Sequence, residues 1–481
     1  MAFAPAPAAR LLHYSDLETA CDDPECLGRL VGTIAAHRTE DTVVAGTGDT
    51  LAPSVLSLET DGRHALELFE AVQPDVETLG NHDFDRGAEA LRSVVHDSPQ
   101  TWVNANVFAP GSDEPEPRDR SDGEVTRVAT HPDDEPFPGT TPTTVLELER
   151  ADLRVGFVGV SDPASSIPPS VPVAAPVDAV REAATDCPDV DRFVVLAHLR
   201  DDSARAVATL ENVDVVLAGH VHRETCEYVD GTLFVRPGAT GRVVWDVDLE
   251  TLEARQLDVT DGPIDRPVMD RFETLREETG LAEVVAQVDE PLPRERERCF
   301  DGECRLGPLV ADAYRWATDA DVGYVDTRSL REGPPLSGDV TVADLVGVVP
   351  FDAPLFVLEV PGAVLRELLE DTIVAGERYD GRDRDLLWGQ VSGVRGVWGE
   401  HERTVGDVLI RGEPLEADAN YEVATSGYVV ASDEFPAVDR SFATRAWGVQ
   451  YEALVEYVRR VGLEVEPDHR LEFPRSVSEF D

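Results

Sequence analysis

Hydrophobic and polar positions alternate with two different periods along the first hundred residues, which predicts strands and helices in turn. Short β-prone runs such as LLHYSD and TVVAGTGD are separated by amphipathic segments such as LGRLVGTIAAHR and RHALELFEAVQ. This alternation is typical of βαβ units, in which right-handed crossovers join parallel strands. From TTVLELER to GRVVWDVDLE, further strand-like runs surround a helix expected near residues 177–185. The last of these runs are linked by turns, which favours an antiparallel flank on a mixed sheet.

The pattern restarts after Leu257, and a chain of 481 residues is longer than one hydrophobic core usually serves. We therefore predict a first domain at 1–257, a linker with a helix at 258–290 and a second α/β domain at 291–481. In the second domain, helical and strand-like runs precede a tail from GQVSGVRGVW onward that we expect to be rich in β-structure. Residues 109–143 are rich in Pro, Asp, Glu and Gly, which predicts an acidic, solvated loop insertion in the first domain.

The charge composition narrows the environment and the partners. The formal net charge is −53, and all 42 basic residues are arginine. An acidic excess of this size repels itself and is better tolerated where salt screens it, which favours a halophilic cytosol. Nucleic-acid polymers and anionic membranes require exposed basic patches, so we expect neither as a partner. Neither a signal peptide nor a membrane-spanning run is evident, so the predicted location is cytoplasmic.

Four of the six cysteines form two C-x4-C pairs, at residues 21 and 26 and at residues 299 and 304. This is not the usual spacing of a zinc ribbon, and no histidine lies near either pair. We expect free or locally paired thiols.

Five short polar motifs follow β-prone runs in the first half of the chain. They are HYSDLE with Asp16, GTGD with Asp49, GNHDFD with Asn81 and His82, LAHL with His198, and GHVH with His220 and His222. Oxygen and imidazole ligands of this kind suit two divalent cations roughly 3.5–4 Å apart that share one carboxylate. Because ligands gather where parallel strands end, we expect these side chains to meet, with Asp49 as the shared carboxylate.

In this order, the motifs resemble those of the 5′-nucleotidase family, which includes UDP-sugar hydrolases and cyclic-nucleotide phosphodiesterases. The first half is similar to the calcineurin-like metallophosphoesterase domain, a four-layer β-sandwich flanked by helices. The second half resembles the substrate-specificity domain of the family through LVADA, Arg331 in DTRSLREG, VVPF and LFVLEVPG. The resemblance covers nearly the whole chain and implies an α/β fold in both domains.

The resemblance implies a ligand set for each of two cations. One would be held by Asp16, Asp49 and His222, and the other by Asp49, Asn81, His198 and His220. Family members read Asp-x-His at the first motif, whereas this chain has Glu18 in place of the histidine. As a ligand, Glu18 would favour a hard cation such as Mn²⁺ or Mg²⁺ over Zn²⁺. Mn²⁺ is thus the favoured cation, with Mg²⁺, Zn²⁺ or Co²⁺ as alternatives; another alternative is that Glu18 is a solvated loop residue.

The resemblance also assigns catalytic roles. His82, oriented by Asp85, would stabilise the phosphoryl transition state, and hydroxide formed on the two cations would attack phosphorus in line. Asp83 is expected to be a supporting or turn residue.

In the second domain, Arg331 matches an arginine of the family's Gly-Gly-Gly-Ile-Arg motif, although Thr327, Arg328 and Ser329 replace the glycines. Tyr428 and Trp388 are candidates for stacking on a nucleotide base, with core packing as the alternative. Asp433 matches a family acidic residue, with a solvated loop position as the alternative.

The predicted function is metal-dependent phosphohydrolysis of nucleotides, as in 5′-nucleotidases. Two enzymatic alternatives use the same metal site: a cyclic-nucleotide phosphodiesterase and a UDP-sugar pyrophosphatase. A third alternative, motivated by Glu18 and the replaced glycines, is a catalytically weak protein that binds nucleotides or metals. The sequence does not predict the oligomeric state.

Overall fold

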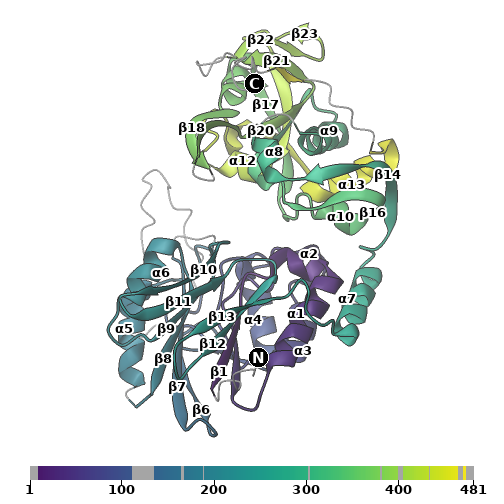
Figure 1. The fold of residues 1–481 in the computed structure, drawn as a ribbon. Coiled ribbons are helices and arrows are strands. Elements are labelled where there is room, and N and C mark those ends of the chain that lie inside the picture. Colours follow the sequence, from purple (N-terminus) through teal and green to yellow (C-terminus); the bar gives the residue numbers. More distant parts are fainter. Residues whose placement is uncertain are drawn as a thin grey trace, which may run out of the picture. The chain divides into compact units, whose positions relative to one another are not determined.

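A computed structural model describes residues 9–110, 135–163, 167–187, 189–301, 304–379, 382–398, 405–432, 434–463 and 470–472. The chain divides into two compact units, Met1–Thr279 and Gly280–Asp481 (Figure 1). The predicted linker at 258–290 contains a helix of the first unit and the start of a strand of the second. Most of the predicted insertion at 109–143 lies outside the described residues.

The first unit contains two sheets. The strands of the seven-stranded sheet, in chain order, are β1 (Arg10–Tyr14), β2 (Thr42–Gly46), β3 (Val76–Glu77), β4 (Thr101–Val103), β5 (Thr140–Thr141), β12 (Val243–Asp248) and β13 (Ala254–Asp258). The strands of the six-stranded sheet are β6 (Thr143–Leu148), β7 (Leu153–Ser161), β8 (Arg192–His198), β9 (Val215–Ala218), β10 (Glu224–Val229) and β11 (Thr232–Pro237). The spatial orders are β13-β12-β1-β2-β3-β4-β5 and β10-β11-β9-β8-β7-β6.

Both sheets contain a parallel core; the seven-stranded sheet is antiparallel at one flank and the six-stranded sheet at both. Strands β1 to β5 run parallel, whereas β12 and β13 pair antiparallel beside β1. In the other sheet, β7, β8, β9 and β11 run parallel, with β6 and β10 antiparallel at the two edges. This is the mixed arrangement that the turn-linked runs predict. Apolar side chains of both sheets, including Leu11, Val43, Phe157 and Leu217, form one buried cluster.

Helices cover the sheets of the first unit (Figure 1). They are α1 (Pro24–His37), α2 (Val55–Thr60), α3 (Ala65–Val72), α4 (Ala88–Asp97), α5 (Pro176–Asp186), α6 (Asp201–Ala208) and α7 (Arg266–Glu278). Helix α1 shows how the sequence sets a boundary: Asp23 accepts hydrogen bonds from the backbone N–H groups of Glu25 and Cys26, and Pro24 occupies the first turn. Its apolar face, with Leu27, Leu30 and Ile34, is buried.

The second unit is built on a five-stranded sheet in the order β20-β15-β24-β17-β25. Its strands are β15 (Val322–Asp326), β17 (Pro354–Pro361), β20 (Gly389–Ser392), β24 (Asn420–Ser426) and β25 (Ala443–Val449). Smaller sheets contain β14 (Val284–Arg294), β16 (Gly333–Thr341), β18 (Ile373–Tyr379), β19 (Arg382–Leu387), β21 (Val394–Trp398), β22 (Val405–Ile410), β23 (Glu413–Pro414) and β26 (Leu471–Glu472). The helices are α8 (Arg296–Asp301), α9 (Leu306–Thr318), α10 (Val342–Val346), α11 (Gly362–Glu370), α12 (Gly427–Ala431) and α13 (Gln450–Val461).

The prediction of a β-rich tail is wrong in part. Helices α12 and α13 follow GQVSGVRGVW, and α13 buries Ala453, Leu454 and Val458 on one face. This three- and four-residue spacing of apolar positions is the helical period, which the short β-prone runs around it obscured. Among the described residues, no helix is long and apolar enough to cross a membrane.

The cysteines carry no disulfide among the described residues. Cys21 and Cys26 donate to different backbone carbonyls, those of Thr50 and Thr240. The sulfur atoms of Cys299 and Cys304 lie 2.7 Å apart.

Candidate metal centre and substrate site

The polar motifs lie where strands of the first unit end. Strands β1 and β2 pair in parallel from Arg10 and Thr42 to Tyr14 and Gly46, so the chain leaves both strands at one edge. Strands β8 and β9 are likewise parallel neighbours, and their motifs also begin at their carboxyl ends. The structure brings together all seven residues predicted to bind cations: Asp16, Glu18, Asp49, Asn81, His198, His220 and His222.

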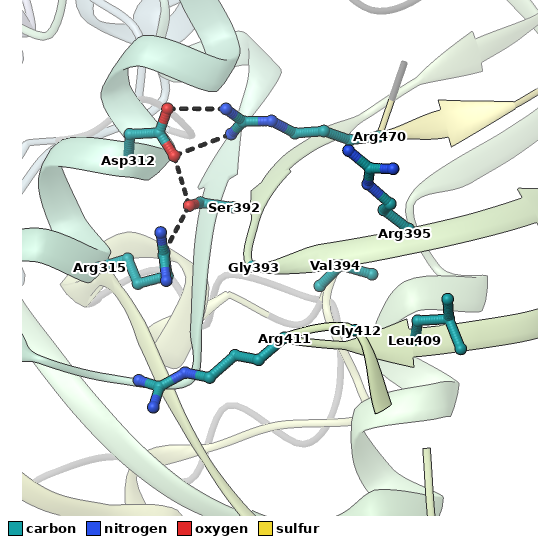
Figure 2. A pocket seen from close by; sticks show the side chains of 10 residues that line it. All are labelled: Asp312, Arg315, Ser392, Gly393, Val394, Arg395, Leu409, Arg411, Gly412 and Arg470. Carbon is teal, nitrogen blue, oxygen red and sulfur yellow. Dashed lines mark hydrogen bonds and ion pairs between the residues drawn. The ribbon is translucent and has the colours of Figure 1, made fainter. Parts of the chain in front are cut away.

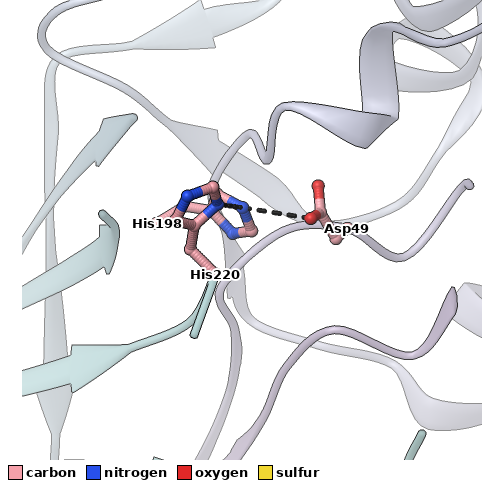
Figure 3. A group of neighbouring side chains, drawn as sticks. All are labelled: Asp49, His198 and His220. Atoms are coloured by element: carbon pink, nitrogen blue, oxygen red, sulfur yellow. Dashed lines mark hydrogen bonds and ion pairs between the residues drawn. The ribbon is translucent and has the colours of Figure 1, made fainter. Parts of the chain in front are cut away.

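One group of potential ligands contains Asp49, His198 and His220 (Figure 3). His198 Nε2 lies 3.1 Å from Asp49 Oδ2 and 3.2 Å from His220 Nδ1. Asn81 belongs to the same group, because its Oδ1 lies 3.0 Å from His198 Nε2 and 2.8 Å from His220 Nδ1. The other ring nitrogen of His198, Nδ1, lies 2.8 Å from the carbonyl oxygen of Thr47, which fixes the ring with Nε2 toward the group.

A second group contains Asp16, Glu18 and His222. His222 Nε2 lies 3.1 Å from Glu18 Oε1 and 3.7 Å from Asp16 Oδ1. Glu18 is largely buried, with 9% of its surface exposed. Its carboxylate therefore faces the other potential ligands and not open solvent.

Asp49 connects the two groups. Its carboxylate lies within ligand distance of Glu18 and His82 as well as of His198 and His220. The backbone N–H of His82 donates to Asp49 Oδ1 at 2.8 Å, which holds this carboxylate in place. His82 Nδ1 lies 2.9 Å from Asp85 Oδ2. Burial opposes protonation of His82, but Asp49 and Asp85 outweigh it and raise its pKa to about 9.

The pKa shifts in the two groups indicate that bound cations would stabilise their crowded carboxylates. Burial and the nearby Asp49 and Glu18 carboxylates raise the pKa of Asp16 to about 7, although two imidazoles oppose this. Burial disfavours the charged form of His198, yet Asp49 and Asp16 raise its pKa to about 10. Three crowded carboxylates with an amide and imidazoles form a donor set that fits hard or borderline divalent cations.

Backbone conformation also adapts to this centre. Four of the potential ligands, Asp16, Glu18, Asp49 and His220, have positive φ angles between 46° and 68°. Side chains rarely adopt this left-handed region, and it concentrates at functional sites. Gly80 permits close approach, because a Cβ atom there would lie 2.1 Å from Asp49 Oδ1.

Two buried acids support the centre. The carboxylate of Asp83 accepts backbone hydrogen bonds from Thr50 and Leu51 at 3.0 Å and from Gly80 at 2.8 Å, so it ties the Asp49 loop to the Asn81 loop. The sequence indicated a supporting or turn role for Asp83. Glu77 accepts a hydrogen bond from the Tyr14 hydroxyl at 2.6 Å. No sequence signal identified Glu77, because a single acid in a short strand usually faces solvent.

In the second unit, the candidate substrate residues do not form a single group. The Arg328 guanidinium lies 4.1 Å from the ring centre of Trp388 and 5.7 Å from that of Tyr428. The guanidinium of Arg331 instead lies 4.7 Å from the ring centre of Phe351. The Tyr428 side chain is 45% exposed, and its hydroxyl donates to Glu434 at 2.8 Å. Arg328 also contacts Glu434, whereas Asp433 lies outside the described residues.

Arg328 is thus a residue of this cluster that the sequence did not identify as a candidate. The buried carboxylate of Asp326 accepts a hydrogen bond from Arg328 Nε at 3.2 Å. The resemblance directed attention to Arg331, which aligns with the family arginine, and treated Arg328 only as a replaced glycine.

Comparisons with known proteins agree with this architecture. Residues 284–440 match the protein family described as 5′-nucleotidase, C-terminal domain. The fold of the chain is that of two-domain 5′-nucleotidases. The 5′-nucleotidase precursor from Thermus thermophilus superposes with a TM-score of 0.71 at 20% identity, covering 97% of this chain and 99% of that one. The 5′-nucleotidase from Candida albicans gives 0.66 at 14% identity, covering 94% and 98%.

Several curated proteins are similar to this chain in sequence, and two of them are much longer. Endonuclease YhcR of Bacillus subtilis is 25% identical over 82% of this chain and 33% of its own length. The trifunctional nucleotide phosphoesterase protein YfkN of the same organism is 21% identical over 95% of this chain and 34% of its own length. The chain thus spans about a third of the length of these two relatives. An apyrase from Tabanus yao is 23% identical over 80% of this chain and 76% of its own length. These relatives are 21% to 25% identical to this chain, and the family match covers residues 284–440.

Proposed function

We propose that this chain is a metal-dependent phosphohydrolase of nucleotides or nucleotide-like phosphoesters, with its catalytic centre in the first unit. The observation that carries the proposal is the convergence of seven potential ligands, from motifs up to about two hundred residues apart, into two groups that Asp49 connects through its proximity to Glu18. Two adjacent groups with one shared carboxylate are the arrangement that two-cation phosphoester hydrolysis requires.

The residues divide the work of holding two cations. Asp16, Glu18 and His222 would hold one, Asn81, His198 and His220 the other, and Asp49 both. Glu18 supports Mn²⁺ or Mg²⁺ as the preferred cation, because a carboxylate replaces an imidazole in the first group. When bound, the cations would polarise the phosphoryl group and lower the pKa of a water molecule.

His82 is the proposed catalytic side chain beside this centre. Its imidazole is only partly exposed, and Asp85 accepts from Nδ1, which leaves Nε2 available to donate to a phosphoryl oxygen. The raised pKa keeps the imidazole charged at neutral pH, so it would neutralise charge as it develops in the transition state.

Nucleoside recognition is proposed for the second unit. Trp388 and Tyr428 offer aromatic faces, and Arg328 and Arg331 offer guanidinium groups in this region. Because Arg328 lies over Trp388, a base that stacks on this ring would have to share it with Arg328 or displace it. Asp433 remains a proposed contact from the sequence.

The relatives include an endonuclease, a trifunctional nucleotide phosphoesterase and an apyrase. A cyclic-nucleotide phosphodiesterase and a UDP-sugar pyrophosphatase are the alternatives on the same residues. The charge of −53 disfavours a nucleic-acid polymer as substrate. A weakly catalytic binding protein is the alternative of another class. The cytoplasmic, halophilic setting stays a prediction.

The test is a substrate panel with the full chain in molar potassium chloride. AMP, cyclic AMP and UDP-glucose are offered with and without Mn²⁺, and phosphate and nucleoside products are measured. We expect Mn²⁺-dependent turnover that falls at least about 100-fold in His82→Ala, but not in His96→Ala, an exposed histidine on α4. Cation binding without turnover of any substrate would refute the enzyme and favour the binding protein.

A further inference from the structure

The second unit contains a hollow of about 410 Å³ that is lined by four arginines (Figure 2). Arg315 comes from α9, Arg395 from β21, Arg411 from the turn after β22, and Arg470 from the residue before β26. The residues that line the hollow include one carboxylate, that of Asp312. Four cationic side chains and one anionic side chain therefore line the hollow, and a second carboxylate, that of Asp321, lies 3.4 Å from Arg411 Nε.

This balance is the reverse of the composition of the chain. Acidic residues outnumber basic residues 95 to 42, so a surface hollow assembled without selection would be acidic. Asp312 pairs with Arg470 and Asp321 with Arg411, whereas Arg315 and Arg395 form no ion pair with the residues that the structure describes. An anionic ligand would compensate the charge of these two guanidinium groups.

Two of the guanidinium groups, those of Arg315 and Arg470, belong to one hydrogen-bond network with Asp312 and Ser392 (Figure 2). Arg470 Nη1 and Nη2 lie 2.9 and 2.7 Å from the two oxygens of Asp312. The Ser392 hydroxyl donates to Asp312 and accepts from Arg315 Nε at 2.8 Å. In the described part of the chain, the Nη atoms of Arg315 have no hydrogen-bond partner, so they remain available as donors.

The other two arginines are more exposed. Arg411 donates from Nη2 to the carbonyl of Ala320 at 2.7 Å, its Nε lies 3.4 Å from Asp321 Oδ1, and its side chain is 47% exposed. Arg395 is exposed and forms no ion pair with any residue that the structure describes. Gly393 permits a close backbone approach at the hollow, because a Cβ atom there would lie 2.2 Å from the carbonyl oxygen of Asp321 and 3.1 Å from Arg315 Cδ.

The hollow is separate from the aromatic cluster around Arg328. In the pairing of β15 with β20, Gly323 lies opposite Ser392, whereas Asp326 lies opposite Gly389, next to Trp388. The hollow and the cluster therefore lie at opposite ends of these two strands, and the two residue pairs are about 10 Å apart along each strand.

We propose that this hollow is a second anion site, which binds the phosphate group of a small molecule. Guanidinium groups match phosphate oxygens in pairs, and arginine remains charged at any physiological pH. The volume falls in the range of small-molecule sites, so it accommodates inorganic phosphate or a phosphomonoester such as a nucleotide. The proposal is independent of the hydrolytic activity, because none of its residues comes from the first unit.

Calorimetry on the full chain tests the proposal, with inorganic phosphate and AMP as the two probes and no added divalent cation. At molar salt the Debye length is only about 3 Å, so arginines that do not touch the ligand contribute little. We expect the R395Q/R411Q double variant to bind at least tenfold more weakly than the native chain. The control R150Q/R181Q removes the same charge from two exposed arginines of the first unit and should bind as the native chain does.

A third variant separates this site from the metal centre. Asp49→Asn alters the metal centre and should keep the anion binding. Equal binding of the two probes identifies phosphate itself as sufficient, and tighter binding of AMP identifies the phosphomonoester; both support the site. The proposal is overturned if neither probe binds, if both double variants bind equally, or if Asp49→Asn alone abolishes binding.

Discussion

Glu18 Oε1 lies 3.1 Å from His222 Nε2, so a carboxylate occupies the place beside Asp16 where the 5′-nucleotidase motif has an imidazole. If Glu18 binds a cation, Glu18→Gln should weaken Mn²⁺ binding about tenfold or more, because a neutral amide replaces an anionic ligand. Glu18→His should shift the preference toward Zn²⁺. Titration of activity with each cation measures both effects. Glu70→Gln, an exposed glutamate on α3, is the control; equal Mn²⁺ dependence in Glu18→Gln and in this control would remove Glu18 from the ligand set.

Asp85 is expected to orient His82 without contacting substrate. Asp85→Asn retains the shape of the side chain but removes the charge 2.9 Å from His82 Nδ1. We expect kcat to fall about 10- to 100-fold with KM nearly unchanged. The pH profile should also move, because the pKa of His82 falls when the carboxylate is lost. An unchanged profile together with an unchanged kcat would show that Asp85 does not act through His82.

Gly80→Ala should impair the metal centre through a steric contact. The new Cβ atom would lie 2.1 Å from Asp49 Oδ1 and 2.3 Å from Asp49 N, and the backbone cannot yield cheaply. We expect cation affinity to fall at least about tenfold, measured by calorimetry with Mn²⁺. Gly87→Ala is the matched control: φ there is +88°, but nothing lies within 4 Å of the new atom. It should cost about 1 kcal/mol of stability and leave cation affinity intact; similar losses in both variants would argue against the contact.

His64 should make the first unit sensitive to mild acid. Burial lowers its pKa from 6.5 to about 3 in the folded protein. The unfolded chain therefore takes up a proton near pH 6.5 while the folded protein does not, so this histidine lowers stability as pH falls. Between about pH 7 and about pH 5.5, the native chain should lose about 1.2 kcal/mol more unfolding free energy than His64→Gln. Urea unfolding at both pH values measures the difference, and parallel losses in the two proteins would contradict the assignment.

The sequence predicted the elements around the metal centre well, because local signals determined them. Asp16, Asp49 and His198 each follow an apolar run, and parallel strands bring such positions to one edge. The substrate cluster was harder to predict. Whether Arg328 or Arg331 reaches Trp388 depends on how the chain turns after β15, which is tertiary information.

The arginine hollow was beyond sequence reasoning. Arg315 and Arg470 are more than 150 residues apart and belong to no motif. In a composition this acidic, single arginines are most simply explained as partners for nearby carboxylates. Only the fold shows that four of them line one hollow.

The left-handed backbone at Asp16, Glu18, Asp49 and His220 fixes the directions in which these potential ligands point before an ion binds. The main chain and the Asp83 carboxylate already hold these loops in place. We therefore expect cations to bind without a rearrangement of the backbone. One metal ion would then replace another without a movement of the loops. The selectivity of the centre would depend on whether an ion's size and preferred geometry match ligands that are already fixed.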